Sequence, residues 1–282
     1  VEPLNSEAFG HFRERIVAYM KKATLEAKVH TSWINPNEEY DAAVQNFVFR
    51  VLDNKGRNRF LNALQAFQHR VAYFGQFNSL SQVLLKLTSP GVPDMYQGTE
   101  IWDFSLVDPD NRRPVDYQRR RLLLNDLKTQ VARAGQDLIP LVQGLLDHSL
   151  DGRIKLYLIF RTLNFRRAHQ PLFSRGAYLP LEAVGEKRDH LCAFARISGD
   201  EGMIVVTPRL VVGLTGGAEQ PPLGERVWKD TWLILPPEWG DHVYRNLFTG
   251  ESLPPKKNGQ VLGLPLMEVF NNFPVALFER IG

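Results

Sequence analysis

The sequence has little of what marks several specialised protein classes. Its 282 residues include a single cysteine, Cys192, so no intrachain disulfide can form and a cysteine-based zinc site is excluded. That usage fits a reducing compartment, and we predict a cytoplasmic protein. No apolar run is long enough to span a bilayer, so no membrane association is expected. The net charge of +3 is too small to indicate a nucleic-acid partner.

Short motifs of common enzyme classes are also missing. The chain has no P-loop, no G-x-G-x-x-G, no G-x-S-x-G and no H-E-x-x-H. Its seven histidines are scattered without the spacing of metal ligands, so we predict neither a metal nor a cofactor. The composition, 44% hydrophobic and 23% charged, is that of a folded globular protein and excludes disorder for the chain as a whole.

Apolar residues recur at helical spacing through most of the first 170 residues. One of the expected helices begins after Asn37 as N-cap, and another contains a break at Gly75. A further segment also alternates like a strand, but its length and basic C-terminal end favour a helix. The pattern therefore predicts helices over residues 7–28, 38–52, 58–88, 117–133, 137–146 and 153–167.

After Pro171 the composition and the apolar pattern of the sequence change. Gly and Pro become frequent, and the apolar runs shorten to the length of strands. Antiparallel strands are predicted over residues 190–197, 203–208, 228–235, 243–247 and 273–278. We therefore predict two domains, residues 1–170 and residues 171–282.

Between residues 99 and 117 the helical pattern gives way to a long loop dense in Asp, Asn, Arg and Pro. A loop of this length within a compact domain is usually functional. Arginine supplies planar forks of donors and aspartate supplies acceptors, which together suit vicinal sugar hydroxyls, and aromatic rings can stack on a sugar. An Asp–Arg network that only pins the loop is the alternative. The residues concerned are Asp108, Asp110, Arg112, Arg113 and Asp116, with the aromatic residues Tyr96 and Trp102.

Three motifs resemble one enzyme family. PGVPDMYQGTE at residues 90–100 resembles the eighth-strand segment of the α-amylase family of glycoside hydrolases. DPDNRRPVD at 108–116 and KATLEAKVHTSWINPNEEY at 22–40 narrow the resemblance to the maltooligosyltrehalose synthases within that family. Shorter matches at 176–181, 194–196, 208–210 and 273–277 extend it over almost the whole chain.

The resemblance implies a fold and a reaction. The fold would be α+β: the mostly helical last portion of a (β/α)8 barrel, with one barrel strand near Val92–Gln97, followed by an antiparallel β-sandwich. The reaction would convert α-1,4-linked maltooligosaccharides to maltooligosyl trehalose by intramolecular transglycosylation at the reducing end, a step of trehalose biosynthesis.

The family's catalytic residues have no counterpart in this sequence. An Asp nucleophile, a Glu acid/base and a third Asp that follows a His would lie upstream of Val1, and none of the seven histidines here is followed by Asp. Neighbouring carboxylates such as Glu38–Glu39 or Asp108 and Asp110 point apart and are not expected to form a glycosidase couple. We therefore expect no catalytic residue within the chain, no activity of the chain alone, and the missing N-terminal catalytic part of the same enzyme as its partner.

For substrate binding, we expect the segment that follows the expected barrel strand to contribute to the sugar subsites. The residues expected to line or brace them are Tyr96, Asp108, Asp110, Arg112 and Arg113, with the two arginines as the forks that bind hydroxyls. His30 and Trp33 would belong to the pocket wall. Two other interpretations stay open: another hydrolase or transglycosylase of the α-amylase family that acts on α-glucans, and a free-standing maltodextrin-binding module. Three tryptophans of the second part belong to its core or form a further sugar-stacking surface: Trp228, Trp232 and Trp239.

Overall fold

The computed structural model describes residues 6–54 and 56–281. The chain forms two compact units. The first unit comprises Val1–Ala72 with Phe104–Val115, and the second comprises Tyr73–Asp103 with Asp116–Gly282. Helix α3 (Arg59–Thr88) contributes its first half to the first unit and its second half to the second unit.

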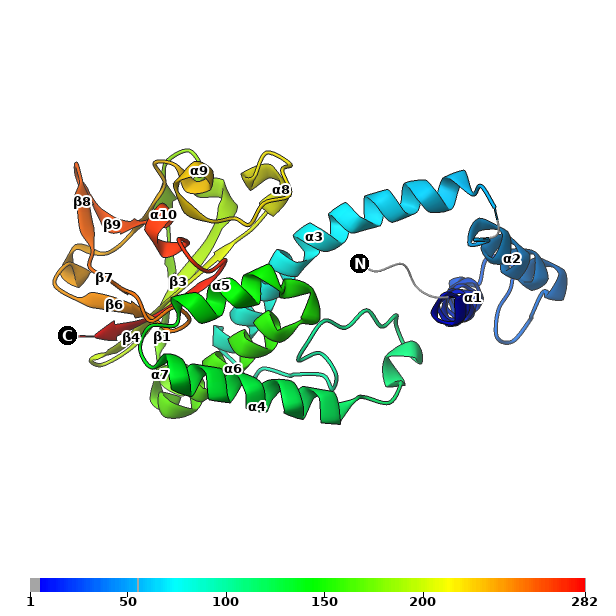
Figure 1. Ribbon diagram of the computed structural model, residues 1–282, viewed down its shortest axis with the longest axis horizontal. Helices are drawn as coiled ribbons and strands as arrows, with labels where there is room; N and C mark the ends of the chain where they lie inside the picture. The colour runs from blue at the N-terminus through cyan, green and yellow to red at the C-terminus, as the bar shows by residue number, and fades with distance from the viewer. Residues whose placement is uncertain (1–5, 55, 282) are drawn as a thin grey trace. The chain divides into compact units, whose positions relative to one another are not determined.

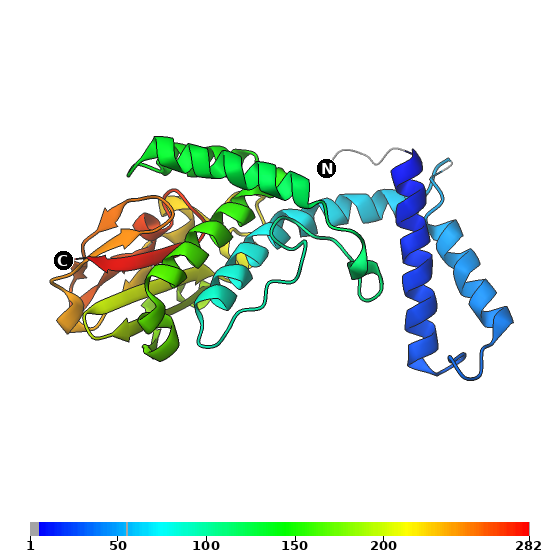
Figure 2. The same ribbon diagram turned by 90° about the horizontal axis from the view of Figure 1, so that it is seen from below.

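In the first unit, α1 (Ser6–Ala27) packs beside α2 (Glu38–Val51), as Figure 2 shows in blue. Their contact face joins the start of α3 in a small core that contains Phe9, Val48 and Leu61. Helix α2 begins as predicted, because the side-chain oxygen of Asn37 accepts the Tyr40 amide at 3.1 Å and satisfies one of the unpaired donors of the first turn. The segment 104–115 adds one 3₁₀ turn, η1 (Asp110–Arg112).

The helices of the second unit follow the predicted periodicity. These are α4 (Tyr117–Ala134), α5 (Ile139–Asp147) and α6 (Arg153–Ala168). The short α7 (Gln170–Arg175) was not predicted. The preference for a helix over residues 153–167 is confirmed. The predicted break at Gly75 is wrong, since α3 continues through it. A glycine inside a helix costs about 1 kcal/mol relative to alanine, and burial of Phe74 and Phe77 on either side offsets that cost.

Two antiparallel sheets follow in the second unit, together with the short helices α8 (Val211–Leu214), α9 (Gly224–Trp228) and α10 (Leu266–Val269). The six-stranded sheet has the order β1-β3-β4-β10-β6-β7, and the four-stranded sheet has the order β2-β5-β9-β8. The strands are β1 (Ala177–Leu181), β2 (Ala183–Val184), β3 (Leu191–Ser198), β4 (Glu201–Pro208), β5 (Trp232–Ile234), β6 (Val243–Asn246), β7 (Ser252–Leu253), β8 (Lys256–Asn258), β9 (Val261–Pro265) and β10 (Ala276–Ile281).

Alternation along the strands places the six-stranded sheet in the middle of three layers. On one face Val205 and Leu277 join the core formed by α3, α5 and α6, whereas on the other face Val206 joins the core shared with Leu233 and Leu264 of the four-stranded sheet. Successive residues of a strand point to opposite faces. Each face of this sheet therefore buries its own apolar set. Figure 1 shows α5 and α6 in green beside the sheet.

A buried arginine ties these layers together. Arg196 of β3 is 2% exposed, and its guanidinium donates to the carbonyl oxygens of Gly176 at 2.9 Å, Phe173 at 3.1 Å and Thr88 at 3.4 Å. Thr88 ends α3 and Phe173 belongs to α7. The cation thus satisfies carbonyls at the C-terminal ends of two helices, where the helix dipole favours positive charge.

Two predicted strands are corrected by the structure. Residues 92–97 form no strand, because a strand needs neighbouring strands to satisfy its backbone groups, and the described residues supply no such partner to this segment. Trp228 lies in the short helix α9 (Gly224–Trp228), so the strand predicted from residue 228 begins only at Trp232. None of the described helices is long and apolar enough to cross a membrane.

Candidate functional site

The aspartates and arginines of the 108–113 segment gather in the first unit against α1. Arg15 of α1 forms a two-pronged pair with Asp110: its Nε donates to Oδ1 at 2.8 Å and its Nη2 to Oδ2 at 2.7 Å. The Leu106 amide donates to the same Oδ2 at 2.6 Å. The Asp110 side chain is 13% exposed. Three charge-assisted hydrogen bonds on one carboxylate make it the fixed centre of the cluster.

These contacts determine the ionisation of Asp110. The hydrogen bond from Arg15 lowers its pKa most, burial opposes that effect, and the Leu106 amide with the charges of Arg15 and Arg113 lowers it further, to about 2. Asp110 is therefore an anion at any physiological pH. It can hold donors in place, but it cannot act as a general acid.

Asp108 and Arg112 form the outer part of the cluster. Lys22 of α1 donates to the Asp108 carbonyl oxygen, and its Nζ lies 3.9 Å from the Asp108 carboxylate. That carboxylate also pairs with Nε of Arg112, whose side chain is 71% exposed. The Asp108–Pro109 peptide bond is cis. Arg112 is thus anchored at Nε, while most of its guanidinium faces solvent.

Arg113 turns back onto its own loop. Its Nε donates to the Asp110 carbonyl oxygen at 3.0 Å and its Nη2 to the Ser105 hydroxyl at 3.1 Å. These bonds keep the two ends of the 104–115 segment together. Of the two arginines, Arg113 braces the loop and Arg112 presents donors.

A cavity of about 280 Å³ lies between α1 and this loop. Its wall combines the acceptors of three carboxylates, the donors of a lysine and an arginine, and a tyrosine ring. Balanced donors and acceptors around an aromatic ring suit a neutral, hydroxyl-rich molecule better than an anion or a metal ion. The residues that contribute these groups are Glu14, Arg15, Tyr19, Lys22, Asp108 and Asp110.

The segment that contains Tyr96 belongs to the second unit. The Tyr96 carbonyl oxygen accepts both the amide and the hydroxyl of Thr99, at 3.1 and 2.6 Å, which closes a turn. Arg120 of α4 fixes the following residues through Glu100 at 2.9 Å and the Gly98 carbonyl at 2.6 Å. The Tyr96 side chain is partly exposed beside this turn.

Trp102 and Lys155 hold the end of the same segment. The Trp102 indole N–H donates to the Ser149 carbonyl at 2.6 Å. Lys155 is buried, donates to the Ile101 carbonyl at 3.3 Å, and lies 5.8 Å above the Trp102 ring. Burial, with Lys86 nearby, lowers the pKa of Lys155 against the opposing effects of Asp103 and Glu100. Trp102 therefore anchors the segment to α6.

The structure unites only part of the predicted site. Asp108, Asp110, Arg112 and Arg113 form one cluster, as described. His30 lies in the loop between α1 and α2, where its ring centroid is 5.0 Å from that of Tyr40, and Trp33 of the same loop is exposed. Tyr96 belongs to the second unit, whereas the other six predicted residues belong to the first.

Sequence reasoning missed Arg15 and Lys22. They lie more than 80 positions before the loop that they hold, so local spacing does not connect them with it. A signal was nevertheless present: positions seven apart share one face of a helix, and Tyr19 lies between them. That polar face of α1 is the one that meets the Asp–Arg loop.

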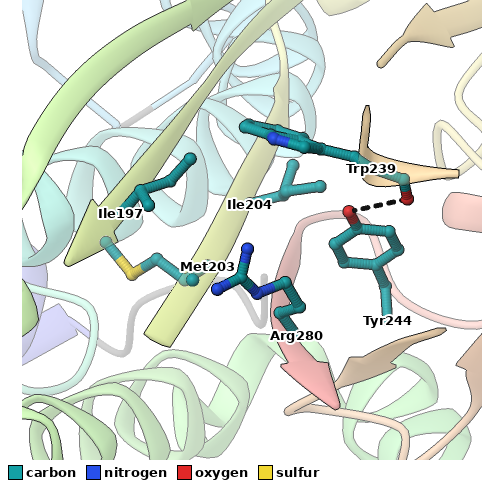
Figure 3. Close-up of a pocket in the computed structure, with 7 residues that line it drawn as sticks. Ile197, Met203, Ile204, Trp239, Tyr244 and Arg280 are labelled. Carbon is teal, nitrogen blue, oxygen red and sulfur yellow. Dashed lines mark hydrogen bonds between the residues drawn. The ribbon is translucent and has the colours of Figure 1, made fainter. Parts of the chain in front are cut away.

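A second hollow, beside the six-stranded sheet, is too small for a ligand (Figure 3). It has room for about 10 Å³ between Ile204, Trp239 and Arg280, about the space that one water occupies. The Tyr244 hydroxyl donates to the Trp239 carbonyl at 3.4 Å, and burial, opposed by Arg280, raises the pKa of Tyr244 to about 12. This phenol therefore stays protonated.

The tryptophans of the second part have packing roles where they are buried. Trp228 is fully buried, stacks on Phe270 at 4.6 Å and donates to the Pro222 carbonyl at 2.8 Å. Trp239 is also buried. Within residues 6–54 and 56–281, no three His, Cys, Asp or Glu side chains are grouped so that they could hold a metal ion.

Comparison with known proteins gives one consistent result. A Mycobacterium tuberculosis protein assigned as maltooligosyl trehalose synthase is 34% identical over 281 residues, which is 99% of this chain and 30% of that protein. The maltooligosyltrehalose synthase structure from Arthrobacter ramosus matches with a TM-score of 0.72 and 30% identity, over 95% of this chain and 30% of that one. The chain is homologous to part of maltooligosyl trehalose synthase. No family model matches it.

A more distant solved structure supports the same relationship. A protein from Sulfolobus tokodaii, also assigned as maltooligosyl trehalose synthase, matches with a TM-score of 0.59 and 27% identity over 95% of this chain and 29% of that one. The chain thus spans about 30% of the length of maltooligosyl trehalose synthases. The alignment with the Mycobacterium protein covers 99% of this chain, so the resemblance expected from the sequence motifs is confirmed.

Proposed function

We propose that this chain is part of a cytoplasmic enzyme that converts maltooligosaccharides to maltooligosyl trehalose. The observation that carries the proposal is the 34% identity that extends over 99% of the chain. In this proposal the helical segments before residue 171 complete a (β/α)8 barrel, and the two sheets form the β-sandwich beside it. The carboxylates that break and form glycosidic bonds belong to the remainder of the enzyme, and the maltooligosaccharide is bound between them and this chain.

The proposed reaction is an intramolecular transglycosylation. A carboxylate attacks the anomeric carbon at the terminal α-1,4 bond of the reducing end, a general acid protonates the departing oxygen, and glucose is released from a covalent glycosyl-enzyme. The anomeric hydroxyl of this glucose then attacks the same carbon, its proton passes to the base, and the carboxylate leaves. The α,α-1,1 product is an isomer of the substrate, so no water is consumed. Water at the intermediate would give hydrolysis instead.

The 108–113 cluster fits the task of retaining the released glucose. Asp110, held by Arg15, fixes the loop. Arg112, anchored through Asp108, presents guanidinium N–H groups to solvent, where they can bind adjacent hydroxyls of a neutral sugar. A glucose held by such contacts reorients without leaving the site. Attack by this glucose on the intermediate is then faster than attack by water.

A segment exchange tests the proposed function. Residues 1–282 replace the matching 30% of the Arthrobacter ramosus synthase, and the chimera is incubated with maltohexaose while reducing ends and free glucose are followed together. Loss of reducing ends without an equal release of glucose is the expected result. A gain of reducing ends with glucose would show a hydrolase, and tight binding without turnover would show a maltodextrin-binding module; either would refute the proposal.

The role of Arg112 is tested in the same chimera. Arg112→Ala should raise the ratio of hydrolysis to isomerisation, because fewer donors hold the released glucose. The matched control is Arg119→Ala on α4, whose side chain is also exposed. Equal product ratios for the two variants would show that Arg112 does not bind the sugar.

A further inference from the structure

A row of large apolar side chains on α3 is exposed in the first unit. Phe60, Leu64, Phe67 and Val71 are 54%, 38%, 67% and 52% exposed. Their spacing of four, three and four residues places them on a single face of the helix. We refer to these four residues as the α3 stripe; α3 is drawn in cyan in Figures 1 and 2.

The next position of this pattern is buried, because there the same face of α3 has a packing partner. Phe74 follows Val71 by three residues, is 4% exposed, and packs with Phe77 and Val211 inside the second unit. In the first unit the adjacent face of α3 is also used, since Leu61 packs against α1 and α2. The stripe is thus a packing face that is covered in the second unit and uncovered in the first.

The spacing also indicates what kind of surface would cover it. Alternating steps of four and three residues are the a and d positions of a heptad, a narrow seam that fits one facing helix. Exposed apolar residues that are contiguous rather than scattered mark an interface. The α3 stripe therefore has the shape and composition of a surface that packs against one apolar helix.

We propose that the α3 stripe docks an apolar helix of the part of the enzyme that lies outside this chain. The inference rests on the proposed function. The length of the relatives supports this occupant: the chain matches them over 95% to 99% of itself but over only 30% of their length. Most of a full-length relative is therefore available to cover a seam that the described residues of the first unit leave open.

Hydroxyl-radical footprinting of the Arthrobacter chimera and of the isolated chain tests the docking. We expect the modification of Phe60 and Phe67 to fall severalfold in the chimera, whereas the exposed Leu150 of the second unit stays equally reactive in both. Protection of the stripe in the isolated chain at every concentration would show that the chain covers it by itself and would overturn the proposal. Protection that appears only as the chain is concentrated, and is no greater in the chimera, would assign the stripe to a second copy and would also overturn it.

A matched pair of substitutions gives a second measurement. Leu64→Glu should lower the thermal unfolding midpoint of the chimera, and Leu150→Glu should not, while neither changes the midpoint of the isolated chain. Equal midpoints for the two chimeric variants would overturn the docking.

The chimera also separates the two proposals. If it forms the trehalose linkage while the stripe stays reactive, the docking fails and the proposed function stands. If the stripe is protected but no such linkage forms, the proposed function fails and the docking stands.

Discussion

Replacement of Asp110 by Asn should loosen the loop that carries the candidate site. The carboxylate holds both prongs of the Arg15 guanidinium and the Leu106 amide. Asn keeps one acceptor but loses the charge, so the charge-assisted part of these bonds is lost. We expect the loop to open more often while the rest of the first unit stays folded.

The size of the effect follows from the pKa of Asp110, which is lowered from 3.8 to about 2. Each unit of pKa shift corresponds to about 1.36 kcal/mol, which gives an upper value of about 2.5 kcal/mol for the stabilisation. Arg15 and Arg113 are partly exposed, and screening by solvent reduces the figure to about 1–2 kcal/mol. Because the pKa is lowered on folding, the stabilisation is full at pH 7 and is lost as the pH falls through about 4 towards 2.

Hydrogen exchange at the Leu106 amide measures this opening directly. At pH 7 the amide of Asp110→Asn should exchange about 5–30 times faster than that of the wild type, the factor that 1–2 kcal/mol represents. Asp116→Asn is the matched control, because it changes the N-cap of α4 in the second unit and keeps a capping side chain. Equal Leu106 exchange in wild type and Asp110→Asn, or a difference that persists below pH 2, would refute the reasoning.

Two further predictions concern the second unit. Arg196→Leu removes the donor of three carbonyls, of which those of Thr88 and Phe173 accept buried hydrogen bonds, and should lower the free energy of unfolding in urea by about 3 kcal/mol. A loss below about 1 kcal/mol would show that water replaces the guanidinium. Gly263→Ala would place a Cβ 2.0 Å from a carbonyl oxygen of β5 and should lower the free energy of unfolding by about 2–3 kcal/mol. Gly144→Ala is the control, because a Cβ at that position meets open space and should not destabilise the protein. Similar unfolding midpoints for the two variants would contradict the close approach at Gly263.

The helices could be predicted from the sequence because their signals are local. Asn37 and the charges that follow it mark the start of α2, and the observed helix over Glu38–Val51 differs from the prediction only at its last residue. Residues 153–167 show both the alternation of a strand and the spacing of a helix, and the length of the segment correctly favoured the helix α6. Tertiary packing overrode the local signal at Gly75.

Strands were harder because their partners lie elsewhere in the chain. The short strands β8 and β9 pair with each other, and β9 also pairs with β5; none of this is visible in the exposed Lys256–Asn258 segment, which has no apolar alternation. The strand predicted over residues 228–235 began too early, because Trp228 is buried in a helical turn against Phe270 and the apolar residues of the strand begin only at Trp232.

The loop of the candidate site could be predicted from the sequence, but the residues of α1 that hold this loop could not. Arg and Asp in close spacing indicated a network around residues 108–113, and the structure shows that network, with Asp110 in the bracing role. Arg15 and Lys22 could not be assigned to it, because only folding brings α1 against the loop. A role in sugar binding stays a prediction for all seven residues: Tyr96, Asp108, Asp110, Arg112, Arg113, His30 and Trp33.

The central claim is that this chain completes a synthase whose bond-breaking carboxylates lie outside it. The most direct test is to incubate the isolated chain with maltohexaose, beside the Arthrobacter chimera, and to follow reducing ends and free glucose. We predict no change with the isolated chain and a loss of reducing ends, without equal glucose, with the chimera. Loss of reducing ends with the isolated chain would contradict the claim, because the catalytic carboxylates would then lie within these 282 residues.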